Sequence, residues 1–284
     1  MVTEVRSLLE EGAQRLVRVA DDAHREAEVL LGAALRRPRA WLLAHADERI
    51  LDCDATDRYE ALVTRRAKGE PVAYLLGEKE FWSLPLAVAP GVLIPRPETE
   101  LLVERALAHL PVDRDCEALD LACGSGAVAL ALASERPRCR VVATDASAAA
   151  TETTRANAAR LGLADRIEVL EGPWFAPIGG RRFTVIASNP PYIANDDPRV
   201  EAAVRRWEPT DALFAGPTGL EALEVIVAEA PRYLIPGGWL ALEHGDTQGE
   251  PVRRMLDAAG FDEVQTHRDL AGRERCSEGR LTVA

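Results

Sequence analysis

The second half of the chain alternates between two hydrophobic patterns, and this alternation constrains the fold more than any other feature. Short apolar runs typical of strands are separated by longer amphipathic stretches typical of helices. The strand-like runs cover residues 117–122, 140–145, 167–172, 183–189 and 239–245, and the helix-like stretches cover residues 128–134, 147–161, 220–233 and 252–259. Strands that alternate with helices form mainly parallel sheets. The sequence therefore predicts an α/β fold with a doubly wound, mainly parallel sheet, which two further strands complete at the end of the chain.

The first 76 residues have a different pattern, because helix-like periodicity continues there without strand-like runs. Apolar side chains recur on one helical face of residues 5–17, and residues 27–37 and 57–69 repeat the amphipathic pattern. We therefore expect a small helical domain at residues 1–76. Composition alone is compatible with either a scaffold or a docking surface.

Residues 77–97 are rich in proline and contain short apolar stretches, which favours a hairpin connector. The expected strands are FWSLPLAV and GVLIP, separated by Ala89-Pro90-Gly91. Proline is common at the first position of a helix, as at Pro97, and acidic residues such as Glu98 and Glu100 are favourable in a first helical turn. A helix is therefore expected to open the third region, residues 98–284.

The charge of the chain narrows the classes of partner. Its 284 residues include 46 acidic and 34 basic ones, which gives a formal net charge of −12. Such a surface gains little affinity for the backbone of nucleic acids, so no direct nucleic-acid partner is expected. No apolar run approaches the roughly 18 residues that span a bilayer, and the acidic start resembles no targeting peptide. We therefore expect a cytoplasmic protein without a membrane partner, and we take it to be a monomer.

The cysteines do not indicate a metal site. There are five of them, none in a C-x-x-C pair, and the five histidines form no ligand cluster with them. We expect no metal and no disulfide framework, but reduced thiols.

A loop with two glycines, Ala-Cys-Gly-Ser-Gly at residues 122–126, follows the first strand-like run. Glycines allow the backbone to approach a ligand closely, and the next helix offers free N–H groups at its start. The next strand ends at Asp145, 19 residues after Gly126, where a carboxylate can bind both hydroxyls of a ribose. Gly124, Gly126 and Ala129 also fit the dinucleotide pattern, so a nicotinamide-dependent oxidoreductase stays open, as does a tight turn without a ligand.

The later strand at residues 183–189 runs into Asn189-Pro190-Pro191-Tyr192 on the same rim as the loop. One alternative is a strand that two prolines stop, with Asn189 as a turn residue. A planar nitrogen conjugated to a π-system is a weak nucleophile, and acceptors on its two N–H groups align its remaining electron density with an electrophile. Asn189 offers a side-chain carbonyl, Pro190 a backbone carbonyl and Tyr192 a ring for stacking. This arrangement suits methyl transfer from a sulfonium and has no evident role in hydride transfer.

The loop and the turn together resemble the Rossmann-type S-adenosylmethionine-dependent methyltransferases, and the resemblance narrows to the peptide-chain release-factor glutamine methyltransferases. It covers nearly the whole chain, through GEPVAYLLGEKEFWSLPLAV, PGVLIPRPETELLVE, ASNPPYI, AGPTGLEAL, YLIPGGWLALEHG and DLAGRER. The ribosomal-protein glutamine methyltransferases share the turn but differ after the Pro-Arg pair. DNA enzymes that methylate amino groups share the turn without this front half. A docking protein of the translation apparatus without enzymatic activity is a further alternative.

The resemblance implies roles for the matching residues. The loop, made of Ala122, Cys123, Gly124, Ser125 and Gly126, would surround the methionine and ribose of S-adenosylmethionine. Asp145 would hold the ribose hydroxyls, Trp174 would lie near the adenine, and Asn189 would stand between cofactor and substrate. The substrate amide would be held by the turn Asn189, Pro190, Pro191 and Tyr192, with Asn189, Pro190 and Tyr192 as the catalytic residues.

The resemblance also implies the reaction and the partner. The methyl acceptor would be the side-chain nitrogen (N5) of the glutamine in the Gly-Gly-Gln loop of class 1 release factors. S-adenosylhomocysteine would be the second product, no metal would take part, and residues 1–76 would help to dock the partner.

The chain departs from the family pattern in two places. Ala122 and Cys123 stand where the family usually has Gly and Thr, and Ala122 is tolerable if its φ is negative. Gly172-Pro173 precedes Trp174 where the family usually has Gly-Asp, so an acidic side chain near the adenine is missing. Both departures bear on the affinity for the cofactor more than on the reaction.

Two other candidates for chemistry are less favoured. Cys123 has no histidine nearby in the sequence, so it is interpreted as a small loop filler rather than a nucleophile. Glu243-His244 closes a strand on the same rim, and we favour a structural role for this pair over acid–base chemistry.

Overall fold

The computed structural model describes residues 3–282, and the chain divides into two compact units between Glu78 and Lys79. The first unit consists of five helices and a short antiparallel strand pair. The helices are α1 (Val5–Leu16), α2 (Ala23–Leu35), α3 (Arg39–Ala44), α4 (Cys53–Arg66) and α5 (Val72–Leu76), and the strands are β1 (Thr3–Glu4) and β2 (Arg49–Ile50).

The helical unit has its own apolar core. Leu8, Leu30, Leu42 and Val63 come from four different helices and are buried together. The helices begin at defined residues, since the Asp22 and Asp52 carboxylates accept N–H bonds from the first turns of α2 and α4. The helical pattern of the first 76 residues therefore reflects a packed unit rather than isolated helices.

The predicted hairpin is present at residues 78–87, but its turn lies earlier in the sequence than expected. Strands β3 (Glu78–Phe81) and β4 (Leu84–Ala87) pair with each other around Trp82 and Ser83, whose φ values are +52° and +58°. Two consecutive positive φ values are typical of a type I′ hairpin turn, which usually contains Asn or Gly. Neither Asn nor Gly occupies positions 82 and 83, so the sequence did not indicate a turn there. The strand predicted at GVLIP was wrong, because residues 91–95 form no strand.

The second unit is built on a seven-stranded sheet with the strand order β12-β13-β11-β8-β5-β6-β7. Its strands are β5 (Cys116–Leu121), β6 (Cys139–Asp145), β7 (Ile167–Glu171), β8 (Phe183–Ser188), β11 (Leu234–Glu243), β12 (Phe261–Arg268) and β13 (Glu274–Leu281). Pairs within the run from β11 to β7 are parallel, and β13 is antiparallel to both of its neighbours. The predicted doubly wound α/β fold with two closing strands is confirmed.

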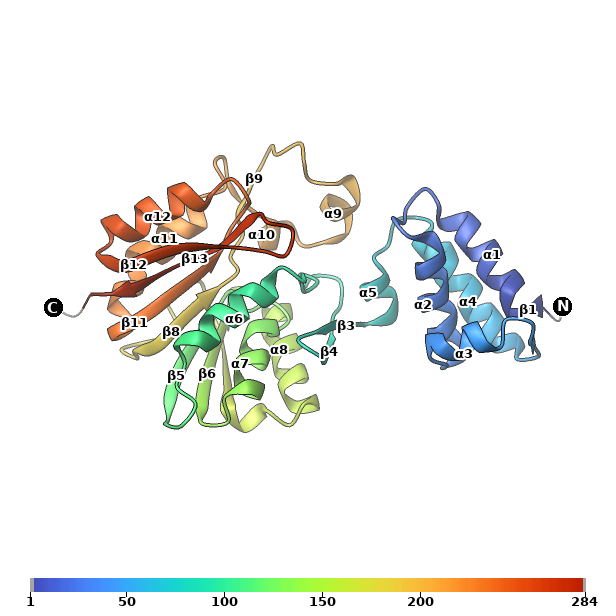
Figure 1. Cartoon of the computed structure of the whole chain (residues 1–284), viewed down its shortest axis with the longest axis horizontal. Coiled ribbons are helices and arrows are strands. Elements are labelled where there is room, and N and C mark those ends of the chain that lie inside the picture. Colours follow the sequence, from blue (N-terminus) through green and yellow to red (C-terminus); the bar gives the residue numbers. More distant parts are fainter. Residues whose placement is uncertain (1–2, 283–284) are drawn as a thin grey trace. The chain divides into compact units, whose positions relative to one another are not determined.

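Helices cover both faces of this sheet (Figure 1). One face packs against α6 (Thr99–His109), α7 (Ala127–Glu135) and α8 (Ala148–Arg160), and the other packs against α11 (Glu221–Glu229) and α12 (Gly249–Ala258). The remaining short elements are η1 (Ala164–Arg166), β9 (Ile193–Ala194), α9 (Ala202–Trp207), α10 (Thr210–Leu213), β10 (Phe214–Gly216) and η2 (Ala230–Arg232).

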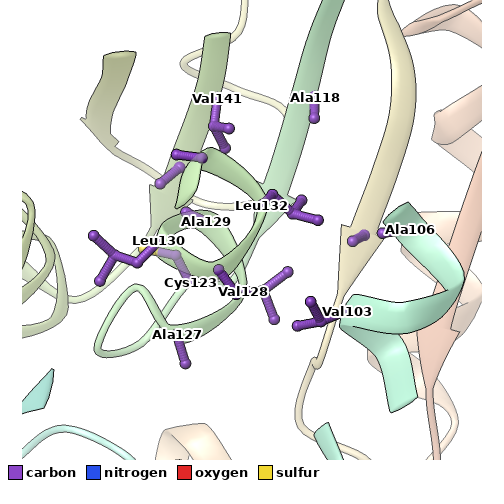
Figure 2. Close-up of a cluster of buried hydrophobic side chains, with 14 of the residues drawn as sticks. Val103, Ala106, Ala118, Cys123, Ala127, Val128, Ala129, Leu130, Leu132 and Val141 are labelled. Atoms are coloured by element: carbon purple, nitrogen blue, oxygen red, sulfur yellow. The ribbon is translucent and has the colours of Figure 1, made fainter. Parts of the chain in front are cut away.

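Close packing around α7 fixes the loop that precedes it. Figure 2 shows Val128 of α7 beside Val103 of α6, with Ala118 of β5 and Val141 of β6 above them in this view. Seven consecutive residues of α7, from Ala127 to Ala133, are buried, so small side chains allow the helix to lie close to its neighbours. Within residues 3–282, no helix is long and apolar enough to cross a membrane.

Candidate active site

Four strands end on one edge of the sheet and bring distant residues together. The loop at residues 122–126 follows β5, Asp145 ends β6, Asn189 follows β8, and Glu243 ends β11. In open α/β sheets this carboxyl edge is where ligands bind. The topology of the sheet therefore places the candidate site at this edge.

The loop after β5 turns sharply, with φ values of +63° at Ala122, +56° at Gly124 and +81° at Gly126. The condition under which Ala122 would be harmless, a negative φ, is thus not met. A left-handed alanine costs roughly 1–2 kcal/mol, which glycine avoids. A Cβ at Gly126 would lie 2.8 Å from Cγ2 of Thr154, so this glycine permits close packing of the loop against α8.

Asp145 holds the loop through one carboxylate oxygen and Ser147, the N-cap residue of α8, through the other. Its Oδ2 accepts the N–H of Gly124 at 2.9 Å, and its Oδ1 accepts the N–H of Ser147 at 2.9 Å. Burial raises the pKa of Asp145 above its ordinary value, although these hydrogen bonds act in the opposite direction.

A cavity of about 340 Å³, here called the loop cavity, adjoins the loop and Asp145. Of the predicted site residues, it is lined by Ala122, Gly124, Asp145, Trp174, Asn189 and Pro191. Thr144 also lines it, and a Cβ at Gly124 would meet no atom within 4 Å. The cavity thus has open space beside this glycine.

A smaller pocket of about 40 Å³ also adjoins the loop, and its lining includes Cys123, Ser125, Asp120 and Asn189. Asp120 is almost completely buried, and burial raises its pKa to about 7 although the N–H of Ala129 donates to it at 2.8 Å. A cationic group in this pocket would stabilise the ionised carboxylate.

Cys123 is not an activated thiol. Burial raises the pKa of its thiol well above the ordinary value, and the nearby charges of Asp120 and Asp145 raise it further. Its Sγ lies 3.5 Å from the Oγ1 of Thr154. Such a thiol fits the interpretation as a loop filler.

A second and larger cavity of about 490 Å³, here called the turn cavity, lies beside Pro190 and Tyr192. Asn189 lines both this cavity and the loop cavity. Four arginines contribute to the walls of the turn cavity: Arg96, Arg199, Arg273 and Arg275. Asn189 therefore borders two spaces, each of which can receive a separate molecule.

Both ends of the turn after β8 are held by hydrogen bonds. The Nδ2 of Asn189 donates to the Oγ1 of Thr99 at 3.1 Å, and the hydroxyl of Tyr192 donates to the Oε1 of Glu243 at 3.1 Å. The backbone carbonyl of Tyr192 accepts a further bond from the side chain of Gln248 at 3.0 Å. The turn is thus held in place by α6, β11 and the start of α12.

Glu243 and His244 do not form an acid–base pair. The Nε2 of His244 lies 2.8 Å from the Oγ of Ser277 and its Nδ1 lies 2.8 Å from the carbonyl of Gly245, whereas Glu243 contacts Tyr192. Burial lowers the pKa of His244, so the ring favours its neutral form.

Two stretches that sequence reasoning did not assign to the site also line the loop cavity. They are residues 91–93, which were predicted as part of a strand, and three residues at the start of α10 or just before it: Pro209, Asp211 and Ala212. Glu208, which directly precedes the second stretch, connects it to the first. Its buried carboxylate pairs with Arg96 and accepts the N–H of Ile94 at 3.2 Å. The sequence gives little indication that these stretches belong to the site. Residues 90–97 are rich in proline, but their partner Glu208 lies more than 100 residues away in the chain, so no local pattern reveals the contact.

Comparison with known proteins assigns the chain to a family. Residues 7–77 match the PrmC N-terminal domain, and residues 98–207 match the methyltransferase small domain. A release factor glutamine methyltransferase of Xylella fastidiosa is 47% identical over 96% of this chain and 97% of its own. That of Pseudomonas aeruginosa is 49% identical over 91% of this chain and 92% of its own.

The chain belongs to the release factor glutamine methyltransferases. The resemblance inferred from the loop and the turn is thus confirmed. Among solved structures, this glutamine methyltransferase is similar in fold to the 16S rRNA N2 G1207 methyltransferase of T. thermophilus, solved with AdoMet and guanosine. The TM-score is 0.55 at 19% identity, and the match covers 72% of this chain and 49% of that one.

Proposed function

We propose that the protein transfers a methyl group from S-adenosylmethionine to the side-chain nitrogen of the glutamine in the Gly-Gly-Gln loop of a class 1 release factor. The observation that carries this proposal is the position of Asn189, which borders the loop cavity and the turn cavity. Methyl transfer requires the acceptor nitrogen to be held in line with the sulfonium methyl. Asn189 can hold a substrate amide there, because it borders both cavities.

The residues around the loop fit S-adenosylmethionine. Its ribose hydroxyls suit the carboxylate of Asp145, and its ammonium group suits the buried carboxylate of Asp120. Trp174 offers an aromatic surface to adenine in the same cavity. The open space beside Gly124 would admit the cofactor close to the backbone.

The chain's part in the chemistry is to orient and to stabilise charge. When bound, S-adenosylmethionine supplies a sulfonium methyl that passes to the glutamine nitrogen while the sulfur keeps the electrons of the broken C–S bond. The carbonyl oxygens of Asn189 and Pro190 accept hydrogen bonds from the two N–H groups of the substrate amide. These contacts strengthen as positive charge develops on nitrogen, and one proton then leaves to water. Tyr192 provides a fixed wall beside the amide.

The partner is inferred from the relatives. The Xylella and Pseudomonas proteins carry the name release factor glutamine methyltransferase, and they match this chain through both of its units. We assign residues 1–76 to docking of the release factor, because this helical unit lies outside the part of the chain that forms the two cavities.

Mass spectrometry of methyl transfer to three alternative substrates tests the proposal. The purified protein is incubated with S-adenosylmethionine and a class 1 release factor, a mixture of large-subunit ribosomal proteins, or duplex DNA. We expect one added methyl group on the Gly-Gly-Gln glutamine of the release factor. Methylation of a ribosomal protein or of DNA instead would overturn the partner, and a chain that does not bind S-adenosylmethionine would overturn the cofactor.

A further inference from the structure

Two residues, Leu93 and Asn189, line all three spaces of the candidate site. Both belong to the walls of the loop cavity, the turn cavity and the smaller pocket that Asp120 lines. By contrast, Ala212 borders only the two larger cavities, and Arg96 borders only the turn cavity and the smaller pocket. The boundary that the three spaces share therefore consists of one polar residue and one apolar residue.

Resting on the proposed function, we infer that Leu93 is the apolar counterpart of Asn189 at the point of methyl transfer. Its side chain contacts S-adenosylmethionine in the loop cavity and the substrate amide in the turn cavity, and it excludes water from the gap between them. Asn189 orients the amide, and Leu93 keeps water away from it.

The backbone that carries Leu93 is held on both sides of this residue. Its neighbours Val92 and Ile94 are 2% and 6% exposed, whereas Leu93 itself is only partly buried. The N–H of Val92 donates to the carbonyl of Ala89 at 3.1 Å, and the N–H of Ile94 donates to Oε2 of Glu208 at 3.2 Å. The side chain of Leu93 thus reaches the three spaces from a fixed position in the backbone.

A buried ion pair supports the same segment. The carboxylate of Glu208 pairs with Arg96 and accepts the N–H of Ile94, so one side chain holds two residues that follow Leu93. Arg96 lines the turn cavity, and Pro209, directly after Glu208, lines the loop cavity. Loss of either partner would leave an unpaired charge next to this segment. Glu208 is therefore a positioning residue that acts through Leu93.

An apolar residue at this boundary affects the reaction through water. A water molecule in the gap would compete for the N–H groups of the substrate amide and would separate its nitrogen from the sulfonium methyl. Exclusion of water strengthens the hydrogen bonds from the amide to the carbonyls of Asn189 and Pro190, because the local dielectric constant is lower. It also keeps the nitrogen and the methyl group at the short distance that transfer requires.

Truncation of three aliphatic residues distinguishes a shared boundary from an ordinary cavity wall. We expect Leu93→Ala to raise two dissociation constants about five- to twentyfold each. One is the Kd of S-adenosylhomocysteine, measured by calorimetry, and the other is the Kd of the release factor, measured with S-adenosylhomocysteine saturating. Val92→Ala in the loop cavity should weaken only S-adenosylhomocysteine, and Val204→Ala in the turn cavity should weaken only the release factor. A folded Leu93→Ala protein with either constant unchanged would overturn the inference.

The polarity of residue 93 provides the second test. Leu93→Met keeps an apolar side chain of similar volume, whereas Leu93→Asn introduces a polar group of similar size. In single-turnover transfer with both ligands saturating, we expect Leu93→Met to stay within about threefold of the wild type and Leu93→Asn to be about 10–10²-fold slower. Val225→Asn, at an exposed residue of α11, is the control for a polar substitution away from the site. A folded Leu93→Asn protein with the wild-type rate would overturn the inference.

Glu208→Gln tests whether the ion pair acts through Leu93. It keeps an oxygen for the N–H of Ile94 but loses the charge that pairs with Arg96, and we expect a rate about three- to tenfold below the wild type. The double variant with Leu93→Ala should be slowed by less than the product of the two single effects. Effects that multiply would overturn the role of Glu208.

The same assays separate this inference from the proposed function. A wild type that transfers no methyl group to the release factor would overturn the proposed function, and the inference with it. A wild type that methylates the release factor, with residue 93 insensitive to substitution, would overturn the inference alone.

Discussion

The N–H of Gly124 donates a hydrogen bond of 2.9 Å to the carboxylate of Asp145, although 21 residues separate them in the chain. This bond joins the loop after β5 to the end of β6, so the strand order of the sheet also positions the loop. Asp145 has a second function in our proposal, since its remaining acceptor capacity is directed to a ribose. Changes at this residue should therefore affect the cofactor before they affect the fold.

Replacing Asp145 by alanine is expected to weaken cofactor binding by about one to two orders of magnitude, which corresponds to roughly 1.4–2.8 kcal/mol. The loss combines the ribose contact with a looser loop. Titration calorimetry with S-adenosylhomocysteine measures the change, and Asp165→Ala, at an exposed residue of η1, serves as the control. An unchanged Kd for Asp145→Ala would reject the ribose assignment.

Ala122→Gly is expected to stabilise the protein. At φ +63° alanine is strained by roughly 1–2 kcal/mol, and the greater freedom of glycine in the unfolded chain offsets part of the gain. We expect a net increase of about 0.5–1 kcal/mol in the free energy of unfolding, measured by urea denaturation. The converse variant Gly124→Ala, at φ +56°, should lose about 1–2 kcal/mol. A lower stability of Ala122→Gly would contradict the strain at this residue.

Glu278 is expected to make folding stability dependent on pH in the acid range. Its buried carboxylate receives bonds from Arg105 at 2.8 Å and from His109 and His267 at 3.0 Å each. Burial alone would raise its pKa, but His109 and Arg105 outweigh burial and lower the pKa to about 2. The contribution is therefore full above the unfolded pKa of about 4.3 and is lost as the pH falls towards 2.

Glu278→Gln tests this window. We expect a loss of roughly 2–3 kcal/mol at pH 7, and a difference from the wild type that shrinks by about half at pH 3. Urea denaturation at the two pH values measures both quantities. Glu263→Gln removes an exposed ion pair with Arg280 and should change stability by less than about 1 kcal/mol. A constant gap between Glu278→Gln and wild type from pH 7 to pH 3 would show that ionisation is not the source.

The thiols are expected to differ sharply in reactivity. Cys53 is exposed, whereas Cys123 is buried and burial raises its pKa well above the ordinary value. Iodoacetamide at pH 8 should modify Cys53 readily and modify Cys123 only after denaturation, as peptide mapping by mass spectrometry would reveal. Rapid modification of Cys123 in the folded protein would reopen its interpretation as a nucleophile.

The fold was predictable because its signal is periodic and local. The alternation after residue 117 gave the strands and helices of the sheet to within a few residues for most elements, as with β6 (Cys139–Asp145) against the expected 140–145. The hairpin turn at Trp82 and Ser83 was missed, because neither Trp nor Ser is a residue type that commonly adopts a positive φ. The register of that hairpin is set by packing, as when Phe81 and Leu86 enter the apolar core.

The candidate site was predictable only in part. Asn189 directly follows β8 and Asp145 ends β6, so topology brings them to one edge. Thr99 and Glu243 are linked to the turn by contacts across 90 and 51 residues, which no local pattern reports. Asp120 could have been found, because an acidic residue at the end of a buried strand beside a glycine loop is an unusual placement.

The most direct measurement for the central claim compares single-turnover methyl transfer by the wild type, Asn189→Ala and Asn195→Ala, with S-adenosylmethionine and a class 1 release factor both saturating. Asn195 is exposed and lies on the same segment, so it controls for general effects of substitution. We expect that Asn189→Ala stays folded, binds S-adenosylhomocysteine and transfers methyl groups about 10²–10³-fold more slowly, whereas Asn195→Ala matches the wild type. A folded Asn189→Ala protein with a near-normal rate would contradict the claim that this side chain joins cofactor and substrate.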